Sequence, residues 1–196
     1  MKRRADRRTG SRRRGTVLED ALLEAAWEEL AAVGYARLTM EGVAARARTS
    51  KAVLYRRWAN RAELVLAAIR RRVVPISSDI PDTGELREDA LSLLRQLRRR
   101  YHEVGPDILH GLMSELHEVP AQVFQVVPDV MMAILRRAAE RGEVRLDRVT
   151  PRVASLPGDL LRHELLLTHA NVSDAVLEEI VDDIFQPLVA RKPAAR

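Results

Sequence analysis

The stretch from Thr39 to Glu63 constrains the fold of this chain more than any other part of it. Its residues, TMEGVAARARTSKAVLYRRWANRAE, predict two short helices joined by a tight turn and followed by the start of a third helix. Thr39, Ser50 and Asn60 each precede one of these helices, and residues of these types are preferred N-caps. Two short helices joined in this way form a helix-turn-helix, whose second helix can lie in a major groove.

The second of these helices, predicted over residues 51–58, has two unlike faces. Leu54 and Trp58 lie four residues apart, so we expect them to pack inward together. A helix that enters the major groove needs small residues at the groove floor and cations near the phosphates. An ordinary amphipathic helix with a solvated basic face would show the same pattern. The residues of the outer face are Lys51, Ala52, Tyr55 and Arg56.

Four runs of residues in this region follow one another in a recognisable order: Leu38–Glu41, Val43–Ala47, Ser50–Trp58 and Asn60–Leu64. In these runs the chain resembles the TetR-type transcriptional regulators. The sequence departs from that family at Arg48, where many relatives have a glycine, and at Trp58, where phenylalanine is more usual. A left-handed backbone at position 48 would cost an arginine on the order of 1 kcal/mol.

The resemblance and the helix faces together predict the residues that contact DNA. We expect Thr39, Ser50 and Tyr55 to position phosphates, and Arg56 and Arg61 to act as cations at the groove walls. We expect Lys51 and Ala52 to meet base edges. The complete predicted set, with the two turn residues included, is Thr39, Arg48, Thr49, Ser50, Lys51, Ala52, Tyr55, Arg56 and Arg61.

The positive charge is concentrated at the front of the chain. Of the 33 basic and 28 acidic residues, residues 1–74 hold 18 and 8, and the remainder holds 15 and 20. Residues 1–15 alone contain eight basic residues against Asp6 and show no apolar periodicity, so we predict an arm that is disordered in isolation. Such an arm adds phosphate contacts or enters the adjacent minor groove; the alternative is a solubilising tail.

The composition also excludes several classes of protein and site. The chain has no cysteine, which rules out disulfides and thiolate metal sites. No apolar run reaches the ~20 residues that span a bilayer, and we predict a cytoplasmic protein with no membrane partner. The sequence carries none of the common catalytic or nucleotide-binding motifs, so we expect neither an enzyme nor a cofactor. His110 and His117 can share a helix face, but solvated histidines are commoner than ligands, and no metal is predicted.

Apolar residues continue at helical spacing to the end of the chain, which predicts an all-α protein of about nine helices. Its N-terminal part is a three-helix head with the helix-turn-helix, and its C-terminal part is a helical ligand-binding and dimerisation domain. We divide the chain into a basic arm (1–15), a DNA-binding domain (16–62) and an effector-binding and dimerisation domain (63–196). The predicted helices outside the helix-turn-helix span about 16–33, 61–73, 85–104, 107–118, 121–141, 151–167 and 173–188.

The resemblance implies that the rear domain binds a small apolar effector and pairs with a second copy. Flexible and aromatic residues near two proline breaks are candidates for the pocket, although such residues are often plain core. The last two helices have apolar faces wide enough to pair across a two-fold axis, or simply to complete the core of one chain. The pocket candidates are Leu109, Met113, Leu116, Phe124, Val127, Met131 and Leu135. The interface candidates are Leu156, Leu160, Leu167, Leu177, Val181, Ile184 and Leu188.

The sequence therefore predicts a homodimeric DNA-binding regulator, a repressor released from a palindromic operator by a small molecule. Two alternatives remain open at this stage. One is a nucleic-acid-binding protein that ignores sequence and binds through its arginine-rich arm. The other is a helical small-molecule-binding protein with no DNA role.

Overall fold

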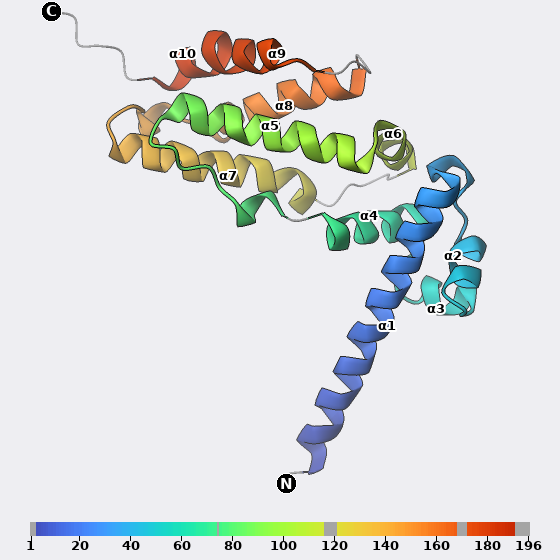
Figure 1. The fold of residues 1–196 in the computed structure, drawn as a ribbon. Coiled ribbons are helices and arrows are strands. Elements are labelled where there is room, and N and C mark those ends of the chain that lie inside the picture. The colour runs from blue at the N-terminus through green and yellow to red at the C-terminus, as the bar shows by residue number, and fades with distance from the viewer. Residues whose placement is uncertain (1–2, 74, 116–120, 168–171, 191–196) are drawn as a thin grey trace, which may run out of the picture. The chain divides into compact units, whose positions relative to one another are not determined.

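Helices make up almost all of the regular structure in the computed structural model, as the apolar spacing predicts (Figure 1). The structure describes residues 3–73, 75–115, 121–167 and 172–190, with side chains for all of these except 3–15, 121–124 and 167. No strand occurs among the described residues, so the all-α prediction is confirmed. The front helices are α1 (Arg3–Val33), α2 (Met40–Arg46), α3 (Lys51–Tyr55) and α4 (Arg61–Arg72). The later helices are α5 (Leu86–Val104), α6 (Pro106–Glu115), α7 (Ala121–Glu140), α8 (Pro151–Leu167), α9 (Asp174–Glu178), the π-helix η4 (Glu179–Phe185) and α10 (Gln186–Val189).

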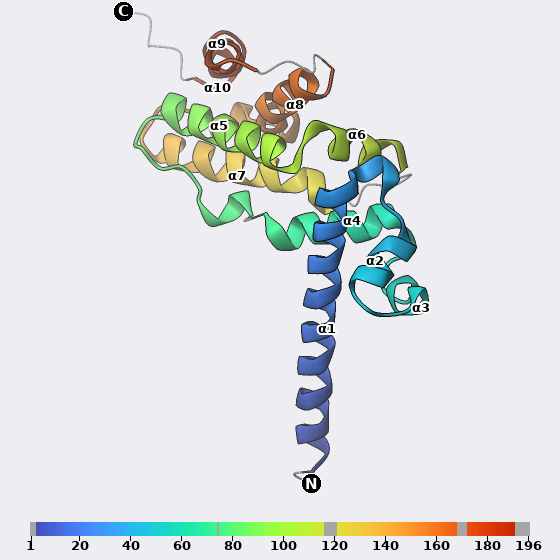
Figure 2. The same ribbon diagram turned by 45° about the vertical axis from the view of Figure 1, so that its right-hand side comes forward.

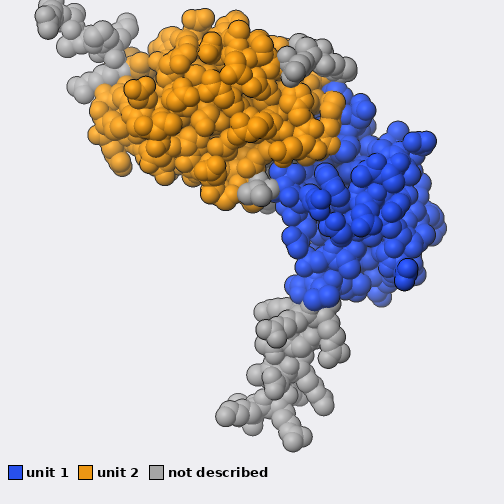
Figure 3. All heavy atoms as spheres, viewed as in Figure 1, with its two compact units in different colours: residues 1–73, 107–117 blue, residues 74–106, 118–196 orange. Residues whose placement is uncertain are grey.

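The chain divides into two units that do not follow the predicted domain boundaries (Figure 3). Unit 1 contains residues 1–73 together with residues 107–117, and unit 2 contains residues 74–106 and 118–196. The prediction ended the DNA-binding domain at residue 62, but α4 packs along α1 and stays with unit 1. Helix α6 also belongs to unit 1, because Leu112 is buried in the core of that unit. Local sequence patterns could not show that α6 packs against helices that lie far from it in the sequence.

Helices α1 and α4 form the base of unit 1. Leu22, Ala26 and Leu30 of α1 and Leu64 and Val65 of α4 are all at most 2% exposed in one hydrophobic core. Burying large apolar side chains stabilises a fold by about 1.5–3 kcal/mol each. The remaining elements of the head are built onto this pair.

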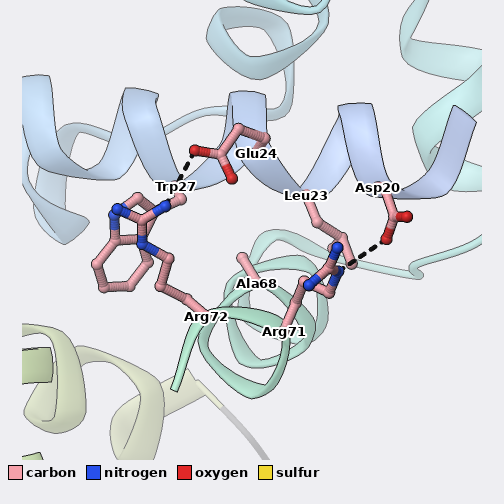
Figure 4. Close-up of a pocket in the computed structure, with 7 residues that line it drawn as sticks. All are labelled: Asp20, Leu23, Glu24, Trp27, Ala68, Arg71 and Arg72. Atoms are coloured by element: carbon pink, nitrogen blue, oxygen red, sulfur yellow. Dashed lines mark hydrogen bonds and ion pairs between the residues drawn. The ribbon is translucent and has the colours of Figure 1, made fainter. Parts of the chain in front are cut away.

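Two ion pairs join the exposed edges of α1 and α4 (Figure 4). Arg71 Nε lies 2.8 Å from Asp20, and Arg72 Nη1 lies 3.2 Å from Glu24. The Arg72 guanidinium also lies over the ring of Trp27, 5.7 Å from its centre, which is close enough for a cation–π contact. These side chains line a groove of about 310 Å³ between the two helices. Exposed pairs of this kind contribute at most about 1 kcal/mol each, so the buried apolar side chains contribute most of the stability of the α1–α4 pair.

The structure continues helix α1 into the predicted basic arm. Helix α1 begins at Arg3 and runs without a break to Val33, whereas we predicted an arm that is disordered in isolation over residues 1–15 and a helix over about 16–33. Arginine is a good helix former, but Gly10 and Gly15 are poor ones, so helix propensity alone does not account for this part of α1. The lack of an apolar face nevertheless does not end the helix at Thr16.

Unit 2 encloses its own core between α5, α7, α8 and the last helix. The segments α9, η4 and α10 run on directly from one another, so residues 174–189 make one helix with a π-helical centre. Figure 1 and Figure 2 show α5 lying beside α7 and α8 within this unit. The innermost side chains include Leu91, Leu94, Ile134 and Phe185, each fully buried.

A buried carboxylate ties the loop before α5 into unit 2. Asp89 is 0% exposed, and its Oδ1 accepts hydrogen bonds from the backbone and the hydroxyl of Thr83, at 2.6 and 2.8 Å. Its other oxygen lies 3.6 Å from the guanidinium of Arg141. Arg141 in turn reaches Glu143, which accepts the backbone N–H of Leu86 at 2.9 Å. The network positions the start of α5 against the end of α7.

Several predicted pocket and interface residues are core residues of unit 2. Val127, Met131 and Leu135 of α7 are at most 7% exposed, and Leu177 and Val181 are completely buried. The prediction that Leu177 and Val181 face a second copy is therefore corrected, because their side chains are enclosed by their own chain. The described part of the chain contains no helix long and apolar enough to cross a membrane.

Candidate nucleic-acid interface

Helix α3 has one face buried in the core and the opposite face exposed, as its sequence predicts. Leu54 is 0% exposed and Trp58, just beyond the helix, is 8% exposed, and both lie in the core of unit 1. Tyr55 is 52% exposed. Lys51, Ala52 and Arg56 are exposed as well. The outer face is thus accessible to a partner, and no carboxylate lies on α3 itself.

The turn between α2 and α3 has the geometry of a Schellman motif. The N–H of Thr49 donates to the carbonyl of Ala44 at 2.9 Å, and the N–H of Arg48 donates to that of Ala45 at 3.1 Å. Arg48 occupies the left-handed position of this motif, with φ of 50°, where glycine is usual. The condition considered for this residue from the sequence, a left-handed backbone with its cost on the order of 1 kcal/mol, is thus met. The residue is exposed to solvent.

Two of the three predicted N-caps form the expected bonds. Thr39 Oγ1 accepts the N–H of Gly42 at 3.0 Å, and the side chain of Asn60 accepts the N–H of Glu63 at 2.9 Å. Ser50 has the extended backbone of an N-cap but makes no capping bond with its side chain. Thr39 and Ser50 are both exposed, and a hydroxyl can donate to a phosphate oxygen while it accepts a capping bond.

Lys51 has an acidic partner at the candidate interface. Its ammonium group binds the carboxylate of Glu41 on α2, and both side chains are at least half exposed. The hydrogen bond lowers the pKa of Glu41 and raises the pKa of Lys51. To bind a base or a phosphate, the Lys51 ammonium group must therefore break its ion pair with Glu41 or bind both groups at once.

Arg61 is directed into unit 1 rather than toward the outer face of α3. Its Nε lies 3.0 Å from Glu115 Oε2 on α6, and a second nitrogen binds the other carboxylate oxygen. Its Nη1 donates to the carbonyl of Leu38 at 2.8 Å. The guanidinium also lies 5.0 Å from the ring centre of Tyr35. These bonds join the start of α4 to the loop before α2, a structural role that competes with the predicted DNA contact of Arg61.

The same cluster fixes α6 to the head. The hydroxyl of Tyr35 donates to Glu115 at 3.2 Å, and a Cβ added at Gly111 would lie only 2.1 Å from the Tyr35 ring. Glycine is thus required where α6 crosses this ring. The Arg61 hydrogen bonds lower the pKa of Glu115, while burial, followed by the charge of Glu115, raises the pKa of Tyr35 to about 12.

A further contact supports α2 from α1. Arg46 Nε lies 2.8 Å from Glu29, and a Cβ added at Gly42 would lie 2.6 Å from the same carboxylate. A side chain at residue 42 would therefore require the Glu29 carboxylate to move. Sequence reasoning identified none of Glu29, Glu41 or Glu115 as the partner of a cation, because each pair joins two separate helices.

The other predicted sites are less fully described. Leu109 and Met113 lie on α6 in unit 1, whereas Val127, Met131 and Leu135 lie in unit 2, and Leu116 and the Phe124 side chain fall outside the described parts. Within the described residues no group of three acidic or histidine side chains could hold a metal ion. His117, one of the two histidines considered for a metal, also lies outside the described residues.

Comparison with known proteins identifies the family of this arrangement. Residues 22–68 match the family model of the bacterial regulatory proteins of the tetR family, and residues 80–184 match the tetracyclin repressor-like C-terminal domain. The chain belongs to the TetR family. The prediction made from residues 38–64 is confirmed, and the match extends through most of the described helices.

Curated relatives and solved structures agree with this assignment. The chain is 32% identical over 190 residues to a DNA-binding transcriptional repressor TetR of Mycobacteroides abscessus, covering 93% of this chain and 98% of the relative. It is 36% identical over 172 residues to an HTH-type transcriptional regulator of Mycobacterium bovis, covering 81% of each. The fold is similar to SmeT, the repressor of the Stenotrophomonas maltophilia multidrug efflux pump SmeDEF, with a TM-score of 0.56, 19% identity and coverage of 91% and 93%.

The left-handed arginine generates a stability prediction. Replacing Arg48 by glycine should raise the free energy of unfolding by up to about 1 kcal/mol, because glycine adopts this backbone without a Cβ clash. Arg48→Ala removes the same cation but keeps the Cβ, so it should not stabilise the fold comparably. Urea unfolding followed by circular dichroism measures both. Equal stabilities for the two variants would contradict the assigned strain.

The Tyr35 cluster generates a pH prediction. The pKa of Tyr35 is higher in the folded protein, about 12, than its ordinary value of 10.0, so its contribution is complete below pH 10 and is lost as the pH rises toward 12. Absorbance at 295 nm should show that one of the three tyrosines ionises late. Tyr35→Phe should remove that late step and flatten the alkaline fall in stability. A late step that survives in Tyr35→Phe would assign it to Tyr55 or Tyr101 instead.

Proposed function

We propose that this TetR-family protein is a homodimeric repressor that binds a palindromic operator through α3 of each protomer. The observation that carries this proposal is the exposed outer face of α3, fixed to the core by Leu54 and Trp58. A helix held in this way can enter a major groove without losing its own packing. Two such helices related by a two-fold axis would read half-sites about 34–36 Å apart, or one turn of the duplex.

The residues of the interface take different roles in this proposal. Lys51 and Ala52, at the N-terminal end of α3, meet base edges, because the first residues of a recognition helix reach the groove floor. Tyr55 and Arg56 meet the phosphates of one groove wall. Thr39 adds a hydroxyl from the start of α2, where its acceptor oxygen already caps that helix.

The turn adds further contacts in this proposal. Arg48, Thr49 and Ser50 lie between α2 and α3 and come to the phosphate backbone with their side chains, because the turn itself uses the backbone N–H groups of Arg48 and Thr49. Arg61 contributes indirectly instead, because its bonds to Glu115 and to the carbonyl of Leu38 hold the head together. A positioning role is supported because these partners occupy all three nitrogens of the guanidinium.

Dimerisation is proposed through the outer faces of α8 and the last helix. Ile184 and Leu188 are 37% and 47% exposed and lie four residues apart, one turn along the helix. Leu156 and Leu160 of α8 are half-buried. The side chain of Leu167 is among those not described, and it remains a candidate. An apolar surface of this kind suits an isologous pair, in which each residue meets its counterpart.

Release by a small molecule is the regulatory part of the proposal. The fold neighbour SmeT has also been solved as a complex with triclosan, at 20% identity and a TM-score of 0.55. By analogy, an apolar effector would bind in unit 2 beside the α7 residues Val127, Met131 and Leu135. It would release DNA only if it bound one arrangement of the paired heads more tightly than the other.

The direct test selects bound fragments from genomic DNA and sequences them. A shared inverted repeat is expected, and fragments without any common sequence would contradict the proposal. Tyr55→Ala and Arg56→Ala should each weaken binding to the selected duplex by about 1–3 kcal/mol, or roughly 5- to 150-fold. Arg70→Ala removes an exposed cation from the last turn of α4 and serves as the charge-matched control. Fluorescence anisotropy measures all three, and equal effects at Arg56 and Arg70 would count against a contact by α3.

The Lys51–Glu41 pair gives a second prediction. Glu41→Gln should strengthen binding several-fold at about 50 mM salt, because it releases Lys51 and removes a negative charge beside the phosphates; the improvement should shrink at about 200 mM. Glu19→Gln on α1 carries the same change of charge outside the interface and should have little effect. In a Lys51→Ala background the improvement from Glu41→Gln should be smaller, as a double-mutant cycle would show. An unchanged improvement in that background would separate Glu41 from Lys51.

A further inference from the structure

The first half of α1 has a composition that cannot form an apolar packing face. Residues 3–15, here called the N-terminal extension, contain seven arginines and one acidic residue, Asp6. Their only aliphatic side chain is that of Ala5. The structure nevertheless continues α1 through this segment as a helix. A polar helix of this kind needs stabilising interactions other than an apolar face, and a partner of opposite charge supplies them.

The helical backbone sorts these arginines by position. At about 100° per residue, most of them fall in two neighbouring rows on one half of the helix, and Asp6 falls on the opposite half. Like charges at spacings of three and four residues destabilise an isolated helix, so a polyanion along these rows would stabilise it. The two rows consist of positions Arg4, Arg8 and Arg12, and positions Arg3, Arg7 and Arg14.

The chemistry favours duplex DNA as that polyanion. A helix that binds a membrane surface needs an apolar face to bury, and the extension has none. Double-stranded DNA carries one negative charge for each 1.7 Å or so of its axis. Within unit 1 the extension projects past α2 and α3 and away from α4 in both Figure 1 and Figure 2. It therefore extends on the side of the head that carries the candidate interface.

The helical state also limits where the extension can lie on DNA. An α-helix with its side chains is about 10–12 Å across, whereas the minor groove is only about 6 Å wide. A helix can lie against the phosphates but cannot enter that groove. About thirteen helical residues span about 20 Å, or about six base pairs.

We propose that the N-terminal extension binds, as a helix, the phosphate backbone of the duplex that flanks each half-site. This inference rests on the proposed function, because α3 must first hold the protein on DNA. It excludes the extended arm in the minor groove that the sequence alone left open. It also makes the contribution of the flanks depend on their length and not on their sequence.

The experiment compares full-length protein with three variants on the selected operator. One variant lacks residues 2–14. Ser11→Pro keeps every charge but breaks the helix in its middle, and Ser11→Ala is the matched control that preserves it. Each is measured by anisotropy between about 50 and 200 mM salt, on duplexes with no flanks and with flanks of about ten base pairs that are either A·T-rich or G·C-rich.

The expected pattern is specific to a helix on phosphates. On flanked duplexes the deletion should weaken binding roughly tenfold or more at about 50 mM salt, and it should reduce the salt slope by about 0.9 for each phosphate that the arginines no longer neutralise. Ser11→Pro should show most of this weakening and Ser11→Ala none, with the same effect on both flank sequences. All four proteins should bind the unflanked duplex alike.

Three outcomes would overturn the inference. Ser11→Pro binding like the full-length protein while the deletion binds weakly would show an arm that does not act as a helix. A weakening confined to A·T-rich flanks would indicate the minor groove, whose width and edges depend on sequence. Equal binding by the deletion and the full-length protein would leave the extension with no DNA contact. Failure of the proposed function looks different, since the full-length protein would then select no sequence whatever the flanks, and the inference would fall with it.

Discussion

The burial of Leu54 and Trp58 is the interaction on which the DNA-binding head depends. Helix α3 has only five residues, and helices of that length do not persist in water by themselves. Leu54 fixes one turn of α3 in the core, and Trp58 fixes the chain just after it. The Schellman turn fixes its other end. Because the buried side of α3 supplies its stability, the residues on its exposed side do not need to pack and can bind a partner.

The sequence predicted this arrangement where the determining contacts are local. Caps at Thr39 and Asn60 and the inward direction of Leu54 all follow from residues within a few positions of one another. The role of Arg61 does not, because its carboxylate partner Glu115 lies 54 residues away on α6. A local pattern shows that a cation is present and cannot show whether a distant acid already binds it. The sequence therefore predicted which surface is exposed, but not which of its cations are already bound by carboxylates.

The same limit explains the rear of the molecule. Apolar spacing located α5 to α10 closely, since each helix buries a continuous stripe. It could not show which side of a wide stripe belongs to its own core. The π-helix at Glu179–Phe185 changes the register within the last helix, with Val181 and Phe185 buried and Ile184 exposed. An added residue in one turn rotates all that follows, and no residue type at this point indicates it. Interface predictions made with a uniform helical period consequently mixed core residues with surface residues.

The charges of unit 1 show why a basic composition is a poor measure of DNA affinity. Counterion release depends on cations that can exchange a small ion for a phosphate, not on those already held by carboxylates. Arg46, Lys51 and Arg61 are held at the candidate interface and its support, and Arg71 and Arg72 are held between α1 and α4.

The cations left for phosphates are therefore fewer than the sequence suggests. Among the residues whose side chains are described, Arg48 and Arg56 have no ion pair and lie at the turn and just after α3. Arg37, before α2, and Arg70, at the end of α4, likewise form no ion pair with a described side chain. The positive charge available near α3 thus comes from a few arginines, and the first half of α1 holds seven more in its sequence. Affinity would then be distributed between a short surface that reads sequence and a longer one that does not.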